Sequence, residues 1–88
     1  MEAEFLDKFS KDLDKISSKS VKNSLSRLIQ DVESAKALSA IPNTKKLKGH
    51  KSAYRIRIGD YRVGVFYEDQ KVTFARIVHR KDIYSVFP

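Results

Sequence analysis

The spacing of apolar residues changes near the middle of this chain from the period of a helix to the period of a strand. In the first half, apolar residues recur every three or four positions, at Leu6, Phe9, Leu13, Ile16, Val21, Leu25, Leu28, Val32 and Ala35. In the second half, residues 54–58 alternate strictly between apolar and basic side chains. Such a change indicates amphipathic helices followed by half-buried strands, which is the order of an α+β domain.

The first half predicts a short strand and two helices. Met1–Phe5 is expected to be an edge strand, and Asp7 is expected to be the N-cap of the first helix. The polar residues at 17–20 interrupt the helical period and supply a cap for the second helix. Two amphipathic helices joined by so short a turn form a hairpin, and their apolar stripes need a sheet to cover them.

Three consecutive antiparallel strands are predicted after an irregular, lysine-rich segment at 37–51. The strands are expected at residues 54–58, 61–67 and 72–79, joined by turns at Gly59-Asp60 and at 68–71. A chain of 88 residues has enough apolar side chains for one core. Residues 1–88 are therefore expected to form a single α+β domain: a short N-terminal strand, a two-helix hairpin and a three-stranded antiparallel sheet.

The alternation places most of the arginines on one face of the predicted sheet. The side chains expected to face the helices are Tyr54, Ile56, Ile58, Val63, Val65, Tyr67, Ala75 and Ile77. The opposite, helix-free face then receives five of the six arginines, Arg55, Arg57, Arg62, Arg76 and Arg80, together with Phe66, Phe74 and Val78. Gly64 is expected among them, where the missing side chain would let a ligand approach the backbone.

The net charge of +7 comes from the second half alone. Residues 1–44 contain seven basic and seven acidic residues, whereas residues 45–88 contain eleven basic and four acidic residues. Arginines on one face repel one another unless a polyanion neutralises them, and a planar guanidinium can hold a phosphate through two hydrogen bonds. Aromatic side chains on that face would stack on bases. The sequence therefore favours RNA as the ligand, the alternative being a generally basic, solvated surface.

Few kinds of catalytic chemistry are compatible with the residues present. The chain has no cysteine, its two histidines are far apart, and it contains neither a nucleophile elbow nor a glycine-rich phosphate loop. No metal and no cofactor are expected. Cleavage of RNA without a metal remains open, because the 2′-hydroxyl of the substrate is the nucleophile. Arg62 and Arg80 are suited to stabilising negative charge, and His79 and Tyr84 to moving protons.

The expected compartment is the cytoplasm. The N-terminus carries acidic residues from its second position, unlike a signal peptide. The longest uncharged apolar stretch, Val63–Tyr67, is far shorter than the roughly 20 residues of a membrane span. The lack of cysteine fits a reducing compartment.

Residues 45–84 contain four motifs that occur together in one family. They are, in order, Lys-Leu-Lys-Gly, Tyr-Arg-Ile-Arg, Gly-Asp-Tyr-Arg and His-Arg-Lys-Asp-Ile-Tyr. This segment resembles the RelE/ParE superfamily of bacterial toxins, and the N-terminal FLDKFSKDLDKI is similar to it more loosely. The resemblance implies a strand, two helices and three antiparallel strands. It also implies a toxin of a type II toxin-antitoxin system, neutralised by a cognate antitoxin. In the RelE branch such a toxin enters the ribosomal A site and cuts mRNA, leaving a 2′,3′-cyclic phosphate.

The resemblance, which matches Arg55, Arg57, Arg62, Arg80 and Tyr84, and the pattern of basic residues together suggest roles for particular side chains. Those assigned to catalysis are Arg62, His79, Arg80 and Tyr84, and those assigned to RNA binding are Lys46, Lys48, Arg55, Arg57 and Arg76. RelE-type enzymes often carry lysines at the positions of Arg55 and Arg57. Arginine stays protonated, so neither residue can be the general base. The base is therefore unassigned, with His79 as the candidate because related toxins have a histidine nearby.

Two other functions remain open at this point. One is a ParE-like toxin that binds DNA gyrase and has no nuclease chemistry, and the other is a non-catalytic basic nucleic-acid-binding module. The presence of His79, Arg80 and Tyr84 favours the nuclease. Since the chain ends four residues after Tyr84, no long helix is expected over the arginines. The apolar residues Ile83, Val86 and Phe87 are expected to be exposed and to contact the antitoxin.

Overall fold

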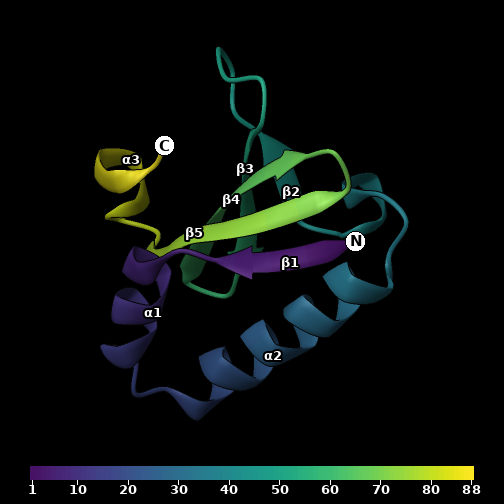
Figure 1. Ribbon diagram of the computed structural model, residues 1–88. Helices are drawn as coiled ribbons and strands as arrows, with labels where there is room; N and C mark the ends of the chain where they lie inside the picture. Colours follow the sequence, from purple (N-terminus) through teal and green to yellow (C-terminus); the bar gives the residue numbers. More distant parts are fainter.

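The structure is a computed structural model that describes residues 1–88, and it confirms the α+β architecture (Figure 1). The elements in chain order are β1 (Glu2–Phe5), α1 (Asp7–Asp14), α2 (Lys19–Ser34), a 3₁₀ turn η1 (Leu38–Ala40), β2 (Thr44–Lys46), β3 (Ala53–Ile58), β4 (Tyr61–Glu68), β5 (Lys71–His79) and α3 (Ile83–Val86). The five strands form one sheet in the order β1-β5-β4-β3-β2, in which only the β1–β5 pair is parallel. No helix has the length and apolar character needed to cross a membrane.

Local signals explain where most elements begin and end. The hydroxyl of Ser18 accepts a hydrogen bond from the backbone N–H of Val21 at 3.3 Å, which confirms the cap predicted for α2. Asp7 is instead the first residue of α1, with Leu6 at the cap position and no side-chain cap. Its carboxylate still lies in the first turn, where negative charge is favourable. Gly59 has a φ of 55°, as the predicted turn between β3 and β4 requires.

Two observed elements, β2 and α3, were not predicted from the sequence. The strand β2 falls within residues 37–51 and pairs with β3, where Lys45 is opposite Arg55. It is three residues long, too short to show an alternation. The helix α3 has four residues and follows the last strand. The sheet therefore has five strands instead of the expected three plus one.

The main core lies between the sheet and the helices α1 and α2. Its residues include Phe9, Ile16, Leu25, Leu28 and Val32 from the helical half and Ile56, Val63, Val65, Val72, Phe74 and Ile77 from the sheet. Phe74 was predicted to face the opposite way. Gly64 pairs with Arg76 while Val65 pairs with Phe74, so Ala75 is an extra residue in β5. This β-bulge reverses the alternation and buries Phe74 completely.

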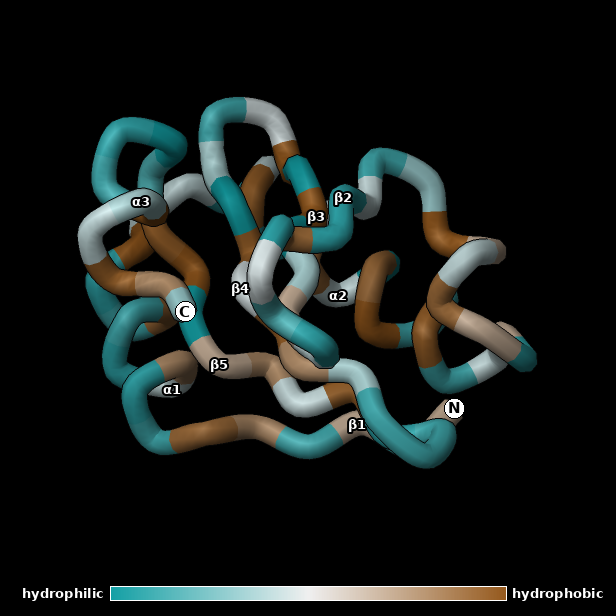
Figure 2. Tube along the Cα trace, turned by 90° about the horizontal axis from the view of Figure 1, so that it is seen from above, coloured by the Kyte–Doolittle hydropathy of each residue, from teal (hydrophilic) through white to brown (hydrophobic).

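A second apolar cluster lies on the other face of the sheet, beneath α3. It contains Leu47, Ala53, Ala75, Ile83 and Phe87, with Phe66, Val78 and Val86 at its margin. Seen from above in Figure 2, α3 and the C-terminus lie over the sheet close to β5. The expectation that this face is free of helices is therefore wrong for its β4–β5 half. Ile83 and Phe87 are buried and Val86 is half-buried, so the prediction that they are exposed is also wrong.

Candidate nucleic-acid interface

The uncovered half of this second face carries basic side chains from three adjacent strands. Lys45 on β2 lies opposite Arg55 on β3, and Arg57 on β3 lies opposite Arg62 on β4. Residues that pair across strands point to the same side of a sheet, so these four share one face. Together with Asn43 and Tyr84 they line a hollow of about 230 Å³. We call Lys45, Arg55, Arg57, Arg62 and Tyr84 the arginine face.

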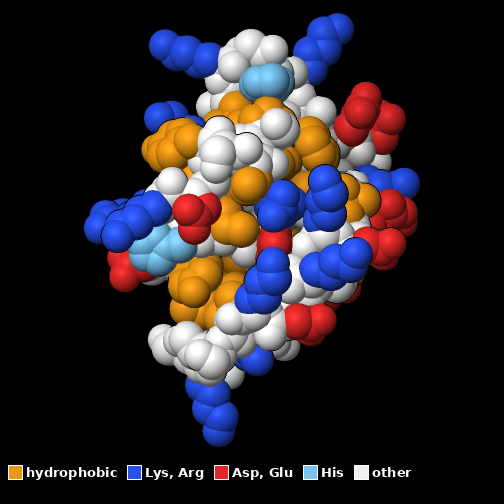
Figure 3. Space-filling model, turned by 90° about the vertical axis from the view of Figure 1, so that its left-hand side faces the viewer, with side chains coloured by type: hydrophobic (Ala, Val, Ile, Leu, Met, Phe, Trp, Pro, Cys, Tyr) orange, Lys and Arg blue, Asp and Glu red, His pale blue; other side chains and the backbone are white.

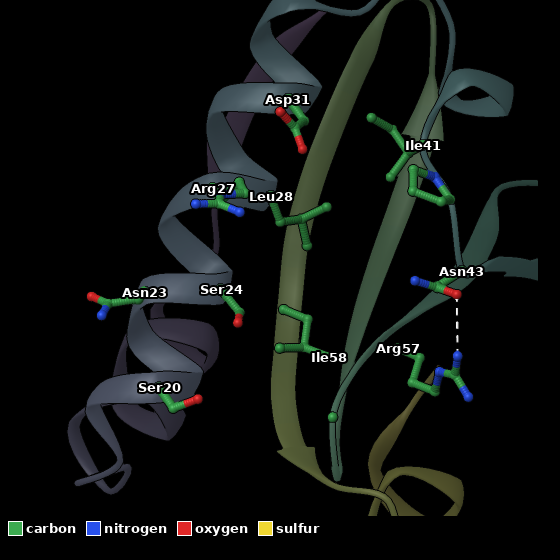
Figure 4. A pocket seen from close by; sticks show the side chains of 12 residues that line it. Ser20, Asn23, Ser24, Arg27, Leu28, Asp31, Ile41, Asn43, Arg57 and Ile58 are labelled. Carbon is green, nitrogen blue, oxygen red and sulfur yellow. Dashed lines mark hydrogen bonds between the residues drawn. The ribbon is translucent and has the colours of Figure 1, made fainter.

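Neutral groups orient two of the guanidinium groups. A guanidinium nitrogen of Arg57 donates to the side-chain oxygen of Asn43 at 3.3 Å (Figure 4). Asn43 is itself fixed by its carbonyl, which accepts from the backbone N–H of Arg57 at 3.0 Å. A guanidinium nitrogen of Arg62 donates to the carbonyl oxygens of Gly59 and Tyr61, both at 3.0 Å. These contacts position the side chains without neutralising their charge.

The third guanidinium lies against an aromatic ring. The central carbon of the Arg55 guanidinium is 4.5 Å from the centre of the Tyr84 ring, within the range of a cation–π contact. The Nε of Arg55 is buried and has no hydrogen-bond partner. Tyr84 is 77% exposed, so its ring and hydroxyl remain accessible. Tyr84 is the aromatic residue that lines the hollow of the arginine face.

The positive charge of the arginine face is not compensated within the protein. The two ion pairs of the structure join Lys71 to Glu4 and Arg76 to Asp12. No carboxylate therefore lies within 4.0 Å of a charged nitrogen of the arginine face. Like charges directly opposite each other on a sheet, as at Arg57 and Arg62, are unfavourable. A face of this kind is stabilised by an anionic ligand. Basic side chains also project elsewhere on the side of the molecule that carries α3 (Figure 3).

Arg76 does not join the arginine face, although the sequence placed it there. Its guanidinium donates two hydrogen bonds to the carboxylate of Asp12 in α1, at 2.7 and 3.0 Å. These bonds raise the pKa of Arg76 above its usual value. The same carboxylate accepts a hydrogen bond from the backbone N–H of Ile77 at 3.1 Å. The pairing of β1 with β5 ends at Phe74, so no strand is available there to accept from this N–H. Asp12 is only 6% exposed, so this contact is structural.

The other two predicted catalytic residues, His79 and Arg80, lie at the end of β5. His79 pairs with Tyr61, which pairs with the buried Ile58, so His79 faces the helical side and not the arginine face. Its ring is 5.8 Å from that of Tyr61, and its Nδ1 accepts from the backbone N–H of Lys81. Arg80 is exposed and follows β5. Its backbone N–H donates to the carbonyl of Asp60, in the same turn whose Gly59 carbonyl accepts from the side chain of Arg62.

Three further predicted positions lie outside the arginine face. Gly64 does not admit a ligand, because a Cβ there would lie 2.5 Å from the ring of Phe87. Lys46 is paired with Tyr54 and so points away from the arginine face. Lys48 lies in the loop between β2 and β3, which projects beyond the sheet (Figure 1). Lys45 and Asn43 were not assigned to the site from the sequence. Lys45 lies opposite Arg55 only because β2 pairs with β3, and β2 was not predicted.

Comparison with known proteins shows the family to which this chain belongs. The model of the ParE toxin of the type II toxin-antitoxin system parDE matches residues 3–84. Toxin RelE3 of Methanocaldococcus jannaschii is 33% identical over 69 residues, which are 77% of this chain and 78% of that protein.

Solved structures show the same fold over nearly the whole chain. The RelB-RelE antitoxin-toxin complex from Methanococcus jannaschii matches with a TM-score of 0.83 and 32% identity, covering 97% of this chain and 99% of that one. YafQ from E. coli strain BL21(DE3) shares the fold with a TM-score of 0.75 and 18% identity, covering 94% and 97%. The family match and the 33% identity together show that this chain belongs to the RelE/ParE superfamily of toxins of type II toxin-antitoxin systems.

Proposed function

We propose that this toxin is a metal-independent, ribosome-dependent mRNA endonuclease of the RelE type. The main support is the convergence of three guanidinium groups, from Arg55, Arg57 and Arg62, on one hollow with no carboxylate to neutralise them. The exposed ring of Tyr84 borders the same hollow. Together they provide phosphate binding and a surface on which a base can stack, as single-stranded RNA requires.

The reaction follows from what the RNA itself supplies. The 2′-oxygen attacks the adjacent phosphorus, the bond to the 5′-oxygen breaks, and the products are a 2′,3′-cyclic phosphate and a 5′-hydroxyl. The protein has to hold the phosphate, stabilise the added negative charge, accept the 2′-proton and supply a proton to the 5′-oxygen. We assign phosphate binding to Arg55 and Arg57, and charge stabilisation to Arg62 and Arg80. Both of the latter are hydrogen-bonded to the turn at Gly59-Asp60, Arg62 through its side chain and Arg80 through its backbone N–H.

Donation of the proton to the 5′-oxygen is assigned to Tyr84, whose phenol has a proton to give; the group that accepts the 2′-proton is not assigned. His79 faces the helical side of the sheet, whereas Tyr84 borders the hollow and exposes its hydroxyl. Arginine cannot take up a proton at working pH, so the guanidinium groups cannot accept the 2′-proton. Tyr84 is thus the proton donor that fits the geometry.

We further propose that a cognate antitoxin binds this toxin. The RelE chain from Methanococcus jannaschii, which is 32% identical to this one, was solved with the antitoxin RelB. A partner with net negative charge would complement the basic second half of the chain. The ribosome and its mRNA are the proposed targets when the antitoxin is absent.

Programmed ribosomes test the nuclease directly. The free toxin is incubated with ribosomes that hold a defined message, and the 3′ ends of the message are mapped and chemically identified. The expected result is cleavage in the A-site codon, leaving a 2′,3′-cyclic phosphate. An intact message on ribosomes that have bound the toxin would contradict the proposal.

A second candidate function is inhibition of DNA gyrase, because the matching family model describes the ParE toxin. A supercoiling assay with purified gyrase distinguishes the two functions. Loss of supercoiling together with an intact message would establish the gyrase inhibitor. Salt-sensitive nucleic-acid binding with neither effect would instead indicate a non-catalytic binding module.

A further inference from the structure

A wide hollow lies at the edge of the sheet, between α2 and the segment that leads into β2. It has a volume of about 700 Å³. One wall is a polar stripe of α2, made of Ser20, Asn23, Ser24, Arg27 and Asp31. In Figure 4, Leu28 and Ile58 point toward each other between this wall and the segment that carries Ile41 and Asn43. We call this hollow the α2 groove.

The α2 groove is continuous with the arginine face. Arg57 and Asn43 line both hollows. The chain that leads into β2 meets β3 at Asn43, whose carbonyl accepts from the N–H of Arg57, so Ile58 and Gly59 have no strand beside them on this edge. Gly59 also lines the groove, and no atom lies within 4 Å of where its Cβ would be. An extended ligand can therefore pass over the end of β3 from one hollow into the other.

Two guanidinium groups without a carboxylate partner line the α2 groove and favour an anion there. Arg27 is exposed and has no carboxylate within 4.0 Å of its guanidinium. Arg57 adds a second positive charge. Asp31 is the one acidic residue of the lining and lies one helical turn beyond Arg27. From Ser20 to Arg27 the stripe extends about 10 Å, at 1.5 Å per residue.

We propose that the α2 groove binds the single-stranded RNA that continues from the arginine face, with Arg27 contacting a phosphate. Ser20, Asn23 and Ser24 carry hydroxyl and amide groups, which commonly contact phosphate and sugar. Asp31 repels the strand and marks the limit of the site. This inference rests on the proposed function, because it assumes that RNA occupies the arginine face, and it gives Arg27 a role in length-dependent binding.

Two oligonucleotides and two variants separate this proposal from the proposed function. The probes are a fluorescent trinucleotide and hexanucleotide of RNA, 2′-O-methylated so that they cannot be cleaved. Arg27→Gln is expected to weaken hexanucleotide binding about fivefold and to reduce the slope of log affinity against log salt by about 0.7, the value of one lost single-strand phosphate contact. Trinucleotide binding is expected to stay unchanged. Lys22→Gln removes a charge from the same helix outside the groove and serves as the matched control.

The possible outcomes point to different conclusions. Equal affinities of Arg27→Gln and Lys22→Gln for the hexanucleotide would overturn the groove proposal. The proposed function would still stand in that case if Arg55→Gln weakens binding of the trinucleotide. Failure of the unaltered toxin to bind either probe would count against both. If Arg27→Gln weakens binding of the antitoxin and not of the hexanucleotide, the groove is a protein interface and the RNA assignment is wrong.

Discussion

At the scale of single residues, the arginines of this toxin differ in the groups that contact their guanidinium. Arg76 is bound by a buried carboxylate, whereas Arg57 and Arg62 contact neutral oxygens and Arg55 contacts an aromatic ring. A guanidinium held by neutral groups keeps its charge for a ligand, while one paired with a carboxylate does not. The sequence alone does not distinguish them, because the partner of Arg76 is 64 residues away in the chain.

The two candidates for proton transfer can be compared by single substitutions. Tyr84→Phe keeps the ring beside Arg55 but removes the hydroxyl, and it should slow single-turnover cleavage by about 10²-fold, the lower range of general acid–base catalysis. His79→Gln should change the rate little, because His79 faces away from the arginine face. A greater loss with His79→Gln than with Tyr84→Phe would return the role to the histidine.

The buried carboxylate of Asp12 should matter for stability. Asp12→Ala leaves the guanidinium of Arg76 and the N–H of Ile77 without their partner, and it is expected to lower the free energy of unfolding by about 3 kcal/mol. Urea denaturation measures this change. Asp14→Ala, an exposed position in the same helix, should change stability by less than about 0.5 kcal/mol. Equal effects of the two substitutions would show that the Asp12 contact is unimportant.

At the scale of elements, α3 determines where the arginine face ends. Phe87 packs on Gly64, and Ile83 is fully buried beside it, so the short helix is fixed on β4 and β5. The same helix presents Tyr84 to Arg55 on its open side. Gly64 of β4 therefore leaves room for the ring of Phe87 and does not admit a ligand.

Gly64→Ala tests this packing. The added Cβ would collide with the ring of Phe87, so we expect stability to fall by about 1–3 kcal/mol, as is typical of overpacking. Tyr84 should also move away from Arg55, which a fluorine NMR signal from 3-fluorotyrosine at position 84 would report. A second substitution, Phe87→Leu, makes room for the Cβ and should restore the signal. An unchanged signal in Gly64→Ala would refute the link between Gly64 and Tyr84.

The elements that could be predicted from the sequence are those with a long, regular pattern. The stripes of α1 and α2, the alternation of β3 and the turns predicted at Gly59-Asp60 and at 68–71 are local features, and the structure confirms them, with the second turn at residues 69–70. The bulge at Ala75 could not be predicted, because one extra residue changes the face of Phe74 without changing the composition. The strand β2 and the helix α3 are too short to carry a periodic signal, and contacts distant in the sequence define them.

At the scale of the whole molecule, charge is separated across the sheet. The edge strand β1 and the start of α1 carry exposed acidic residues at Glu2, Glu4 and Asp7, whereas β2 and β3 at the other edge carry the lysines and arginines. The field of such a molecule orients it as it approaches a polyanion. The arginine face and the α2 groove lie on the basic side, so both would be turned toward RNA on the first encounter.

If the arginine face performs chemistry on mRNA, its substitution must change the single-turnover cleavage rate on programmed ribosomes. Arg62→Ala should slow this rate by at least about 10²-fold, the usual effect of removing a charge-stabilising donor. Lys15→Ala, which removes an exposed charge after α1, should leave the rate unchanged. If Arg62→Ala cleaves the message as fast as Lys15→Ala does, the arginine face is not the catalytic site.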